Sequence, residues 1–510
     1  MINRSKPYWL LILILAIIKF ILPFILQSSV YELQRDEYLY YEQGQHLALG
    51  YMENPPMISY LGGISSWLGG SVFWIKFWPA IFGAATVIAT CLLTAELGGK
   101  KFAQLLAGIA VCTGAYLRIH ALFQPNVLDI FFWTLAIYCI VKYINCSKVK
   151  YLYWFAISIA LGFWGKYSVL FIAVALIVSL LLTKHRKIFA EKKLYIAAVF
   201  ALLLILPNVW WQYNHNWPLV HHMKELQETQ LKFSNPGEFL KDQLMMLIAV
   251  TIVWLVGLVW LLQNRQWRFL AYSYFLVLLL LIAGRGKSYY ALGIYPMLLA
   301  AGGVAWEQFT QRRYWIRYTL CAIIIAFTIL ILPVLLPTRS PEKLAAFYKK
   351  IGMKNKWEDQ QDHPLPQDFA DMLGWRELNQ KFEHTIYMGL PDSAKESTFV
   401  YCDNYGQAGA LRFYGKHARF RNWVMSDNGS FLLWMPDSIS FKHLLYITEK
   451  TPSPDNKYFK YFESSMIMDS ITNPFSRQYG NKIIFFRNAD EKAVKLFQES
   501  FAKTKKEFTR

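Results

Sequence analysis

Acidic side chains gather at two points of one short stretch near the amino terminus. Asp36 and Glu37 form an adjacent pair, and Glu53 stands just before a Pro55–Pro56 pair that fixes the backbone. A third acid, Asp129, lies at the start of a later apolar run. A carboxylate held beside a hydroxyl nucleophile can accept the proton that the nucleophile loses as it attacks. Asp36, Glu37 and Asp129 are therefore candidate catalytic residues, with helix capping or plain solvation as the alternative for each.

Basic and aromatic residues form a second group further along the chain. Lys166 interrupts an apolar run, and Arg285 and Lys287 flank a single glycine in a short loop. Two cations so close together can grip one phosphate, and a departing phosphate needs such charge compensation in place of a carboxylic acid. Tyr289 and Tyr290 follow directly. These five residues are candidates for phosphate binding, and anchoring at a membrane interface is the alternative interpretation.

The composition indicates that membrane helices position these groups. Of the 510 residues, 55% are hydrophobic and only 17% are charged, which is too apolar for a soluble protein of this length. Apolar runs long enough for a hydrocarbon core of about 30 Å recur up to residue 336. We expect the first run to be retained as a helix and not cleaved as a signal peptide. About eleven transmembrane helices are predicted, near residues 8–27, 72–95, 102–118, 127–144, 151–164, 166–183, 194–212, 242–262, 268–283, 289–306 and 316–336.

The distribution of basic residues predicts the orientation in the membrane. The net charge is +19, and lysines and arginines fall largely in every second connection, such as Lys100–Lys101, Lys184–Lys193 and Arg312–Arg317. By the positive-inside rule, these connections and the amino terminus are cytoplasmic. A basic surface beside anionic lipid accounts for the charge, so we expect no nucleic-acid partner. The outer side then carries the loops 28–71, 119–126, 213–241 and 284–288 and the tail that follows residue 336.

The chain changes character after residue 336. Charged residues become frequent, and alternating apolar stretches at 398–402 and 482–486 stand among helical patterns at 342–351, 375–382 and 490–501. We therefore predict a transmembrane domain over residues 1–336 and a small α/β domain over residues 337–510. Five of the six cysteines lie in or beside the apolar runs, so we expect no disulfide framework and no cysteine metal site.

The stretch from Arg35 to Pro56 resembles the first outer loop of membrane glycosyltransferases with the GT-C fold. The resemblance is to the bacterial family 39 and the aminoarabinose-transferase-like branch, which is related to protein O-mannosyltransferases. Asp36, Glu53 and Asp129 match three acidic positions of that family. The run from Gly284 to Pro296 is similar to its basic, tyrosine-bearing loop, which contacts the carrier phosphate. The resemblance covers roughly residues 1–336.

The resemblance implies roles for the acids and a metal. It makes Asp36 the general base, while Glu53 would help to hold a divalent metal near the leaving phosphate. His222 or the neighbouring His221 would be a second metal ligand, and no nucleotide or organic cofactor is implied. In the aminoarabinose branch a lysine follows the loop acid, whereas Asn54 stands there in this sequence. The donor and acceptor of that branch are therefore not carried over.

The sequence as a whole predicts an α-helical polytopic membrane protein with the GT-C fold and an α/β domain on the outer side. A weaker likeness to the family extends into this tail, around Trp375 and residues 404–414. The expected activity is that of an inverting glycosyltransferase, which moves a sugar from a polyprenyl-phosphate donor to a lipid, glycan or protein acceptor on the periplasmic side of a bacterial inner membrane. Membrane lipids are its other expected partners.

Two other classes of function stay open at this point. A transporter or flippase for lipid-linked sugars would also need many helices and cations for phosphate, but it predicts charged or broken helices at the bilayer midplane. A non-catalytic subunit of a glycan-assembly complex would keep the fold without the chemistry. Asp36 and Glu53 argue against that second class.

Overall fold

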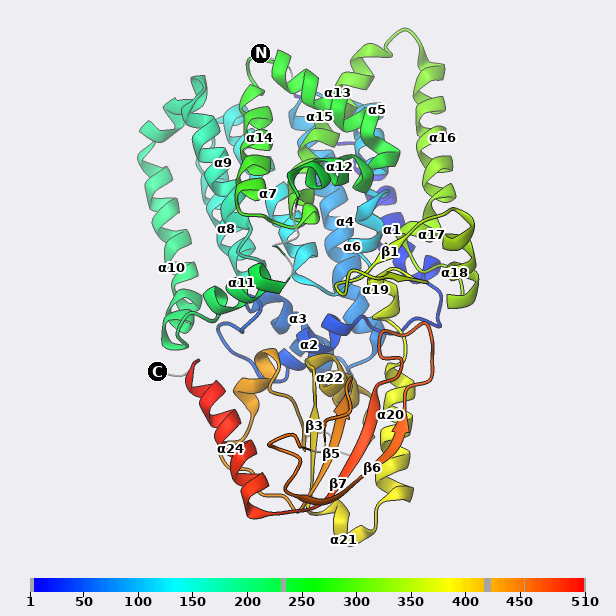
Figure 1. Ribbon diagram of the computed structural model, residues 1–510. Coiled ribbons are helices and arrows are strands. Elements are labelled where there is room, and N and C mark those ends of the chain that lie inside the picture. Colours follow the sequence, from blue (N-terminus) through cyan, green and yellow to red (C-terminus); the bar gives the residue numbers. More distant parts are fainter. Residues whose placement is uncertain (1–3, 230, 232–234, 417–422, 454, 509–510) are drawn as a thin grey trace.

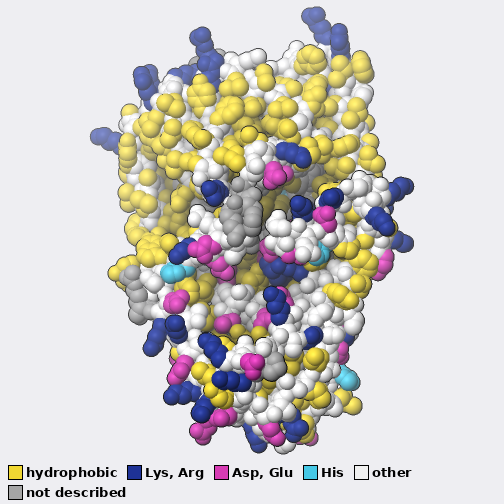
Figure 2. All heavy atoms as spheres, in the orientation of Figure 1, with side chains coloured by type: hydrophobic (Ala, Val, Ile, Leu, Met, Phe, Trp, Pro, Cys, Tyr) yellow, Lys and Arg dark blue, Asp and Glu magenta, His cyan; other side chains and the backbone are white. Residues whose placement is uncertain are grey.

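The computed structural model describes residues 4–229, 231, 235–416, 423–453 and 455–508. Long helices form one part of the molecule, and a sheet flanked by helices lies at one end of this bundle (Figure 1). Figure 2 shows hydrophobic side chains covering the surface of the helical part, whereas charged side chains are frequent over the part with the sheet. On α10 (Lys192–Asn214), Leu202 and Trp210 are 60% and 62% exposed. Such large apolar surfaces are expected where helices face lipid.

Five helical segments among the described residues are long and apolar enough to cross a membrane. They are α1 (Trp9–Leu26), α4 (Val72–Glu96), α7 (Pro125–Cys146), α10, and the run Ser288–Phe309, which ends in α15 (Tyr295–Phe309). The number rises to seven if two bent pairs each count as one span. One pair is α9 (Val169–Leu181) with the 3-10 helix Lys184–Ala190, and the other is α12 (Pro236–Met246) with the run Ile248–Gln263, which contains α13 (Thr251–Gln263). The bundle also contains α5 (Lys101–Val111), α8 (Lys150–Gly165), α14 (Arg268–Ala283) and α16 (Tyr314–Leu330).

Each of the eleven predicted segments overlaps a helix, but some of them are broken. The segment predicted at 102–118 divides into α5 and α6 (Ala115–Ile119) at Gly114, which has a φ of +58°. A Cβ at Gly114 would also lie 2.8 Å from the Met246 carbonyl oxygen, so this close approach excludes a side chain. A helical membrane fold is confirmed, whereas eleven spans remain a prediction.

The centre of the bundle is α4, which packs against α1, α5, α7 and α15. Where α13 crosses α15, the two backbones nearly touch. A Cβ added at Gly257 or at Gly302 would lie 2.1 Å from a carbonyl oxygen of the other helix. Small residues at such crossings are typical of helices that pack in lipid, because close backbone contact replaces the hydrophobic drive that water supplies.

Short segments lie between the bundle and the sheet (Figure 1). The loop predicted as the first outer loop, residues 28–71, contains α2 (Arg35–Gln43) and α3 (Met57–Trp67), and a later loop contains α11 (Pro218–Thr229). The chain then leaves the bundle through α17 (Leu332–Leu335) and α18 (Pro341–Lys350). A small antiparallel pair, β1 (Asn355–Lys356) and β2 (Asp362–His363), precedes α19 (Gln367–Ala370).

The tail contains a five-stranded sheet with the order β4-β3-β5-β7-β6. Its strands are β3 (Thr398–Cys402), β4 (Val424–Met425), β5 (His443–Thr448), β6 (Phe462–Ser470) and β7 (Lys482–Ala489). β3 runs parallel to β4 and β5, whereas β7 runs antiparallel to β5 and β6. Besides α18 and α19, the described residues of the tail form the helices α20 (Trp375–His384), α21 (Asp392–Lys395), α22 (Tyr405–Tyr414) and α24 (Glu491–Lys506). The predicted α/β character of the tail is confirmed.

Successive residues of β3 face the two sides of the sheet, as a strand requires. Phe399 and Tyr401 belong to a core shared with Phe497 of α24. Val400 and Cys402 belong to the large core that also contains residues of α20, α22 and α2 and reaches into the bundle. The sheet and the bundle are therefore joined through α2 and α22.

Candidate active site

The two adjacent acids at the start of α2 have different surroundings. A capping box begins the helix: the Gln34 side chain accepts from the Asp36 N–H at 2.8 Å, and Glu37 Oε2 accepts from the Gln34 N–H at 2.7 Å. Glu37 is fully buried, and it also accepts from Lys76 Nζ at 2.7 Å and from the Phe123 N–H at 2.6 Å. Because both of its oxygens are engaged away from solvent, the structure does not support Glu37 as a catalytic group. Its role is to fix α2 to α4.

Asp36, by contrast, keeps 26% of its side chain exposed. Its Oδ1 accepts from the Tyr405 hydroxyl at 2.8 Å and lies 3.4 Å from Arg35 Nε. Among the described residues, its Oδ2 has a single long contact of 3.5 Å, with Gln124 Nε2. One oxygen is thus held in place while the other can accept a proton, which is the arrangement that a general base needs.

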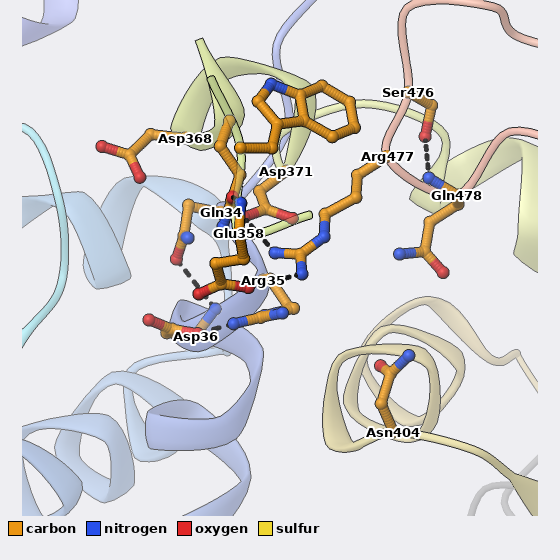
Figure 3. A network of polar contacts seen from close by, with 12 residues as sticks. Gln34, Arg35, Asp36, Glu358, Asp368, Asp371, Asn404, Ser476, Arg477 and Gln478 are labelled. Atoms are coloured by element: carbon orange, nitrogen blue, oxygen red, sulfur yellow. Dashed lines mark hydrogen bonds and ion pairs between the residues drawn. The ribbon is translucent and has the colours of Figure 1, made fainter. Parts of the chain in front are cut away.

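A network of charges connects Asp36 to the tail (Figure 3). Arg477, in the loop before β7, lies 2.7 Å from Glu358 and 3.3 Å from Asp371. The Arg35 N–H donates to the Asp371 carbonyl at 3.2 Å. Burial raises the pKa of Asp371 to about 6, and the charges of Arg35 and Arg477 act against this rise. The network therefore ties the start of α2 to two segments of the tail.

Glu53 is held by the tail as well. Its Oε1 accepts from the Ser430 N–H at 2.7 Å, and its Oε2 accepts from the Ser430 hydroxyl at 2.5 Å and from Gln43 Nε2 at 3.0 Å. Burial raises the pKa of Glu53, while the Ser430 hydrogen bonds and the His222 charge act in the opposite direction. Both oxygens of this carboxylate are thus oriented by hydrogen bonds.

The two neighbouring histidines of α11 point to different partners. His222 is close enough to Glu53 for its charge to act on that carboxylate, whereas the His221 ring lies 5.3 Å from the Phe508 ring. Within the described residues, no group of three or more His, Cys, Asp or Glu side chains could hold a metal ion. Glu53 and His222 would supply at most two protein ligands, and both Glu53 oxygens already accept hydrogen bonds, so the divalent metal stays a prediction.

Lys166 follows α8 and reaches the first turn of α7. Its Nζ donates to Asn126 Oδ1 at 2.7 Å, and it stands 3.9 Å from the centre of the Tyr290 ring and 5.5 Å from that of Tyr289. Asp129 is buried and its charge interacts with Lys166. The structure therefore brings Lys166, Tyr289 and Tyr290 together, and Asp129 lies close enough for its charge to act on Lys166.

The loop 284–288 separates its two cations. Lys287 is half-buried, and burial lowers its pKa, while the carboxylates of Glu358, Asp36 and Asp368 oppose this effect. Arg285 is exposed and adopts a left-handed backbone with a φ of +52°. The charge of Asp36 thus acts on Lys287, whereas the Arg285 side chain is exposed to solvent.

Tyr40 of α2 shows that the two groups of candidate residues converge. Burial raises the pKa of Tyr40, and the groups whose charges add to the effect are Asp36, Tyr405, Glu53 and Tyr290. These four residues come from α2, the tail, the loop before α3 and the run that leads into α15. The charges of residues from four separate segments therefore act on one tyrosine of α2.

Comparison with known proteins agrees with the resemblance that the sequence carries. Residues 53–211 match the family described as dolichyl-phosphate-mannose-protein mannosyltransferase. This segment contains Glu53, Asp129 and Lys166 but not Asp36. The lipid A galacturonosyltransferase RgtD of Rhizobium johnstonii is 25% identical over 193 residues. That match covers 38% of this chain and 41% of RgtD, so it spans less than half of either protein.

Solved structures match over nearly the whole chain. ArnT from Cupriavidus metallidurans bound to undecaprenyl phosphate is similar with a TM-score of 0.64, over 95% of this chain and 99% of that chain, at 11% identity. The chain has the GT-C glycosyltransferase fold. The apo form of ArnT gives a TM-score of 0.59 over 94% of this chain and 97% of that chain, also at 11% identity. Because both superpositions include nearly all of each chain, the GT-C likeness extends to the tail.

The sequence patterns did not identify the residues of the tail that contact the acids of the candidate site. Tyr405, Gly429 and Ser430 lie more than 350 residues after the acids that they contact, and no spacing rule connects positions so far apart. One signal was present, since the weak likeness around residues 404–414 includes Tyr405. Ser430 had no comparable signal.

Proposed function

We propose that the protein is an inverting glycosyltransferase, which moves a sugar from a polyprenyl-phosphate donor to an acceptor hydroxyl on the outer side of a bacterial inner membrane. The observation that carries this proposal is the convergence of Asp36, which has one open carboxylate oxygen, with Lys287 and the Lys166–Tyr290 pair. A base for the acceptor and cations for a phosphate are the two requirements of such a transfer. The family match supports the proposal, as does the bound undecaprenyl phosphate of one ArnT structure.

The proposed reaction is a single displacement. The acceptor oxygen attacks the anomeric carbon of the sugar, and its proton passes to Asp36 Oδ2. The bond between the anomeric carbon and the phosphate oxygen breaks, and its electron pair leaves with the polyprenyl phosphate. Because attack and departure occur on opposite faces, the configuration inverts. A phosphate leaves as a weak base, so the site needs no carboxylic acid to protonate it.

Residues on the bundle side hold the donor phosphate in this proposal. Lys166 and Lys287 bind its oxygens, the hydroxyls of Tyr289 and Tyr290 donate to it, and Arg285 adds charge from the rim. A divalent cation at Glu53 and His222 would supply further positive charge to the leaving group. No nucleotide is required, because the phosphate ester already activates the sugar.

The proposed orientation follows from the charges at the two ends of the bundle. Lysines and arginines project from the end opposite to the tail (Figure 2), as expected of a cytoplasmic face. The candidate site and the tail then lie in the periplasm. Residues 1–336 would be the membrane domain that binds the carrier, and residues 337–510 a periplasmic domain that covers the acids of the first outer loop.

Transfer by the purified protein tests the proposal. We would incubate the wild type and Asp36→Asn with synthetic polyprenyl-phosphate sugars and a membrane extract as the acceptor source, and measure sugar transfer with and without a chelator. Asp427→Asn is a matched control, because Asp427 also accepts from a tyrosine hydroxyl, that of Tyr401 at 2.7 Å, but within the tail.

The expected result is transfer by the wild type and the Asp427 variant, with a loss of about 10²- to 10⁴-fold in Asp36→Asn. Loss with the chelator would support the cation. Normal transfer by a folded Asp36→Asn variant would contradict the assignment of the base. If the wild type transfers no sugar from any donor, the proposed reaction is wrong.

A further inference from the structure

The tail contacts both acids of the first outer loop directly, through two separate segments. The Tyr405 hydroxyl donates to Asp36, and Ser430 donates twice to Glu53. We propose that Tyr405 and the Gly429–Ser430 turn are positioning residues, so that the soluble part of the chain sets the geometry of both acids. This inference rests on the proposed function, because it assigns Asp36 to the acceptor and Glu53 to the donor phosphate.

The contact at Tyr405 is built by a close approach of two helices. Gly406 and Gly409 of α22 face α2: a Cβ at Gly406 would lie 2.5 Å from Arg35 Cγ, and one at Gly409 would lie 2.9 Å from Tyr38 Cβ. The Asn404 side chain caps α22 by accepting from the Gln407 N–H at 3.0 Å. The first residue of the helix, Tyr405, is therefore held in a fixed place against α2.

At this place the Tyr405 ring and hydroxyl act on two neighbouring residues. The ring lies 5.3 Å from the Arg35 guanidinium, and the hydroxyl donates to Asp36 Oδ1 at 2.8 Å. Since Arg35 Nε also lies on Oδ1, at 3.4 Å, the rotation of the carboxylate is fixed and Oδ2 is presented for proton transfer. A base whose orientation is set in advance loses less entropy on reaching the transition state.

The second contact depends on a glycine. Gly429 has a φ of +61°, and a Cβ at this position would lie only 2.1 Å from Glu53 Oε1. The turn thus brings the Ser430 N–H and hydroxyl to 2.7 Å and 2.5 Å from the two oxygens of Glu53. Any side chain at residue 429 would displace the carboxylate from these donors.

The two contacts predict different kinetic effects. Tyr405 acts on the proposed base, so Tyr405→Phe, which keeps the ring beside Arg35, should lower kcat about tenfold or more and leave the donor KM within about twofold. Ser430 acts on the acid assigned to the donor phosphate, so Ser430→Ala should raise the donor KM about fivefold and leave kcat within about twofold. Gly429→Ala should raise the donor KM further.

The matched control is Tyr414→Phe. Tyr414 lies on the same helix and its hydroxyl accepts from the Tyr38 hydroxyl of α2 at 3.1 Å. The variant therefore weakens the same helix contact, and the carboxylate beside Tyr414 is that of Glu32, not Asp36 or Glu53. We would measure kcat and donor KM of the full-length variants in lipid nanodiscs, with the donor that the wild type uses. We would also follow hydrogen exchange of the peptides that cover residues 34–44 and 50–57.

The expected result is a kcat loss in Tyr405→Phe that is absent in Tyr414→Phe, with faster exchange of residues 34–44 in the Tyr405 variant. Equal kcat losses in both tyrosine variants, or wild-type kcat in Tyr405→Phe, would overturn the positioning role while leaving the glycosyl transfer of the wild type intact. If the wild type itself transfers no sugar, the proposed function fails, and unchanged exchange in Tyr405→Phe would then overturn the positioning role independently.

Discussion

The two sides of the candidate site are held by different parts of the molecule. Asp36 and Glu53 are on the first outer loop, and their carboxylates are fixed by Tyr405 and Ser430 of the tail. Lys166, on the other side, is fixed by the membrane helix α7, because its Nζ donates to Asn126 Oδ1 at 2.7 Å, and the charge of the buried Asp129 also acts on it. The tail therefore determines the positions of the two carboxylates, whereas the bundle determines the position of the Lys166 ammonium. Substitutions on the two sides should change different properties of the proposed transfer reaction.

The largest effect is expected where the acid loop itself is anchored to the bundle. Glu37→Gln leaves the Lys76 ammonium buried against a neutral amide, and breaking such a buried pair costs about 3–5 kcal/mol in the free energy of unfolding. The thermal midpoint in detergent should therefore fall strongly. The molecules that stay folded should keep the wild-type kcat, because Glu37 has no oxygen available for a substrate.

The control for this variant is Glu42→Gln, at the other end of α2, where a buried carboxylate binds Arg412 of the tail at 2.6 Å. Both variants should lose stability. A Glu37→Gln protein with the wild-type thermal midpoint and a much lower kcat would contradict this prediction. It would show that Glu37, like Asp36, is a catalytic residue.

A smaller effect is expected on the bundle side. Lys166→Met removes the ammonium beside the Tyr290 ring, and a lost charge-assisted hydrogen bond to phosphate should raise the donor KM about tenfold or more. The acceptor KM should stay the same. Steady-state kinetics with each substrate varied in turn would measure this, and Lys142→Met, which breaks an ion pair with Glu96, is a control for the loss of a lysine in the bundle. A change in the acceptor KM alone would show that Lys166 binds the acceptor and not the donor phosphate.

The same contrast explains what the sequence could and could not predict. Local composition and spacing predict the membrane helices, the acids of the loop and the cations at 166 and 287. Each of these features depends on a short stretch of sequence. Asp36 and Glu37 are chemically alike and adjacent. Their environments differ because Lys76 and Phe123, which belong to other segments, donate hydrogen bonds to Glu37. Tyr405 and Ser430 lie still farther along the sequence from the acids that they contact. Contacts between residues so distant in sequence depend on the tertiary fold, which no local pattern describes.

The pH dependence of donor binding should reveal the contribution of Ser430. Burial raises the pKa of Glu53 above its ordinary value, and the Ser430 hydrogen bonds lower it. As the pH falls from 7 in an assay without a divalent cation, which would otherwise hold the carboxylate ionised, the carboxylate therefore takes up its proton at a higher pH than an ordinary glutamate, whose pKa is about 4.3, and the donor KM should rise. Ser430→Ala removes one donor, so the rise in KM should begin at a higher pH than in the wild type. Superimposable KM profiles for the two proteins would separate Glu53 from donor binding.

The smallest effect is expected at Arg285, which shares its loop with Lys287 but not its surroundings. Arg285 is exposed, whereas Lys287 is half-buried and interacts with the charge of Asp36. Arg285→Gly also suits the backbone, since glycine adopts the φ of +52° without strain. The donor KM of this variant should rise by about twofold to threefold in low salt, and the difference should vanish near 0.5 M salt, because screening removes the attraction of an exposed charge. Lys287→Met should keep its defect at that salt concentration. An Arg285 effect as large as that of Lys287, and equally resistant to salt, would show that both cations bind the phosphate directly.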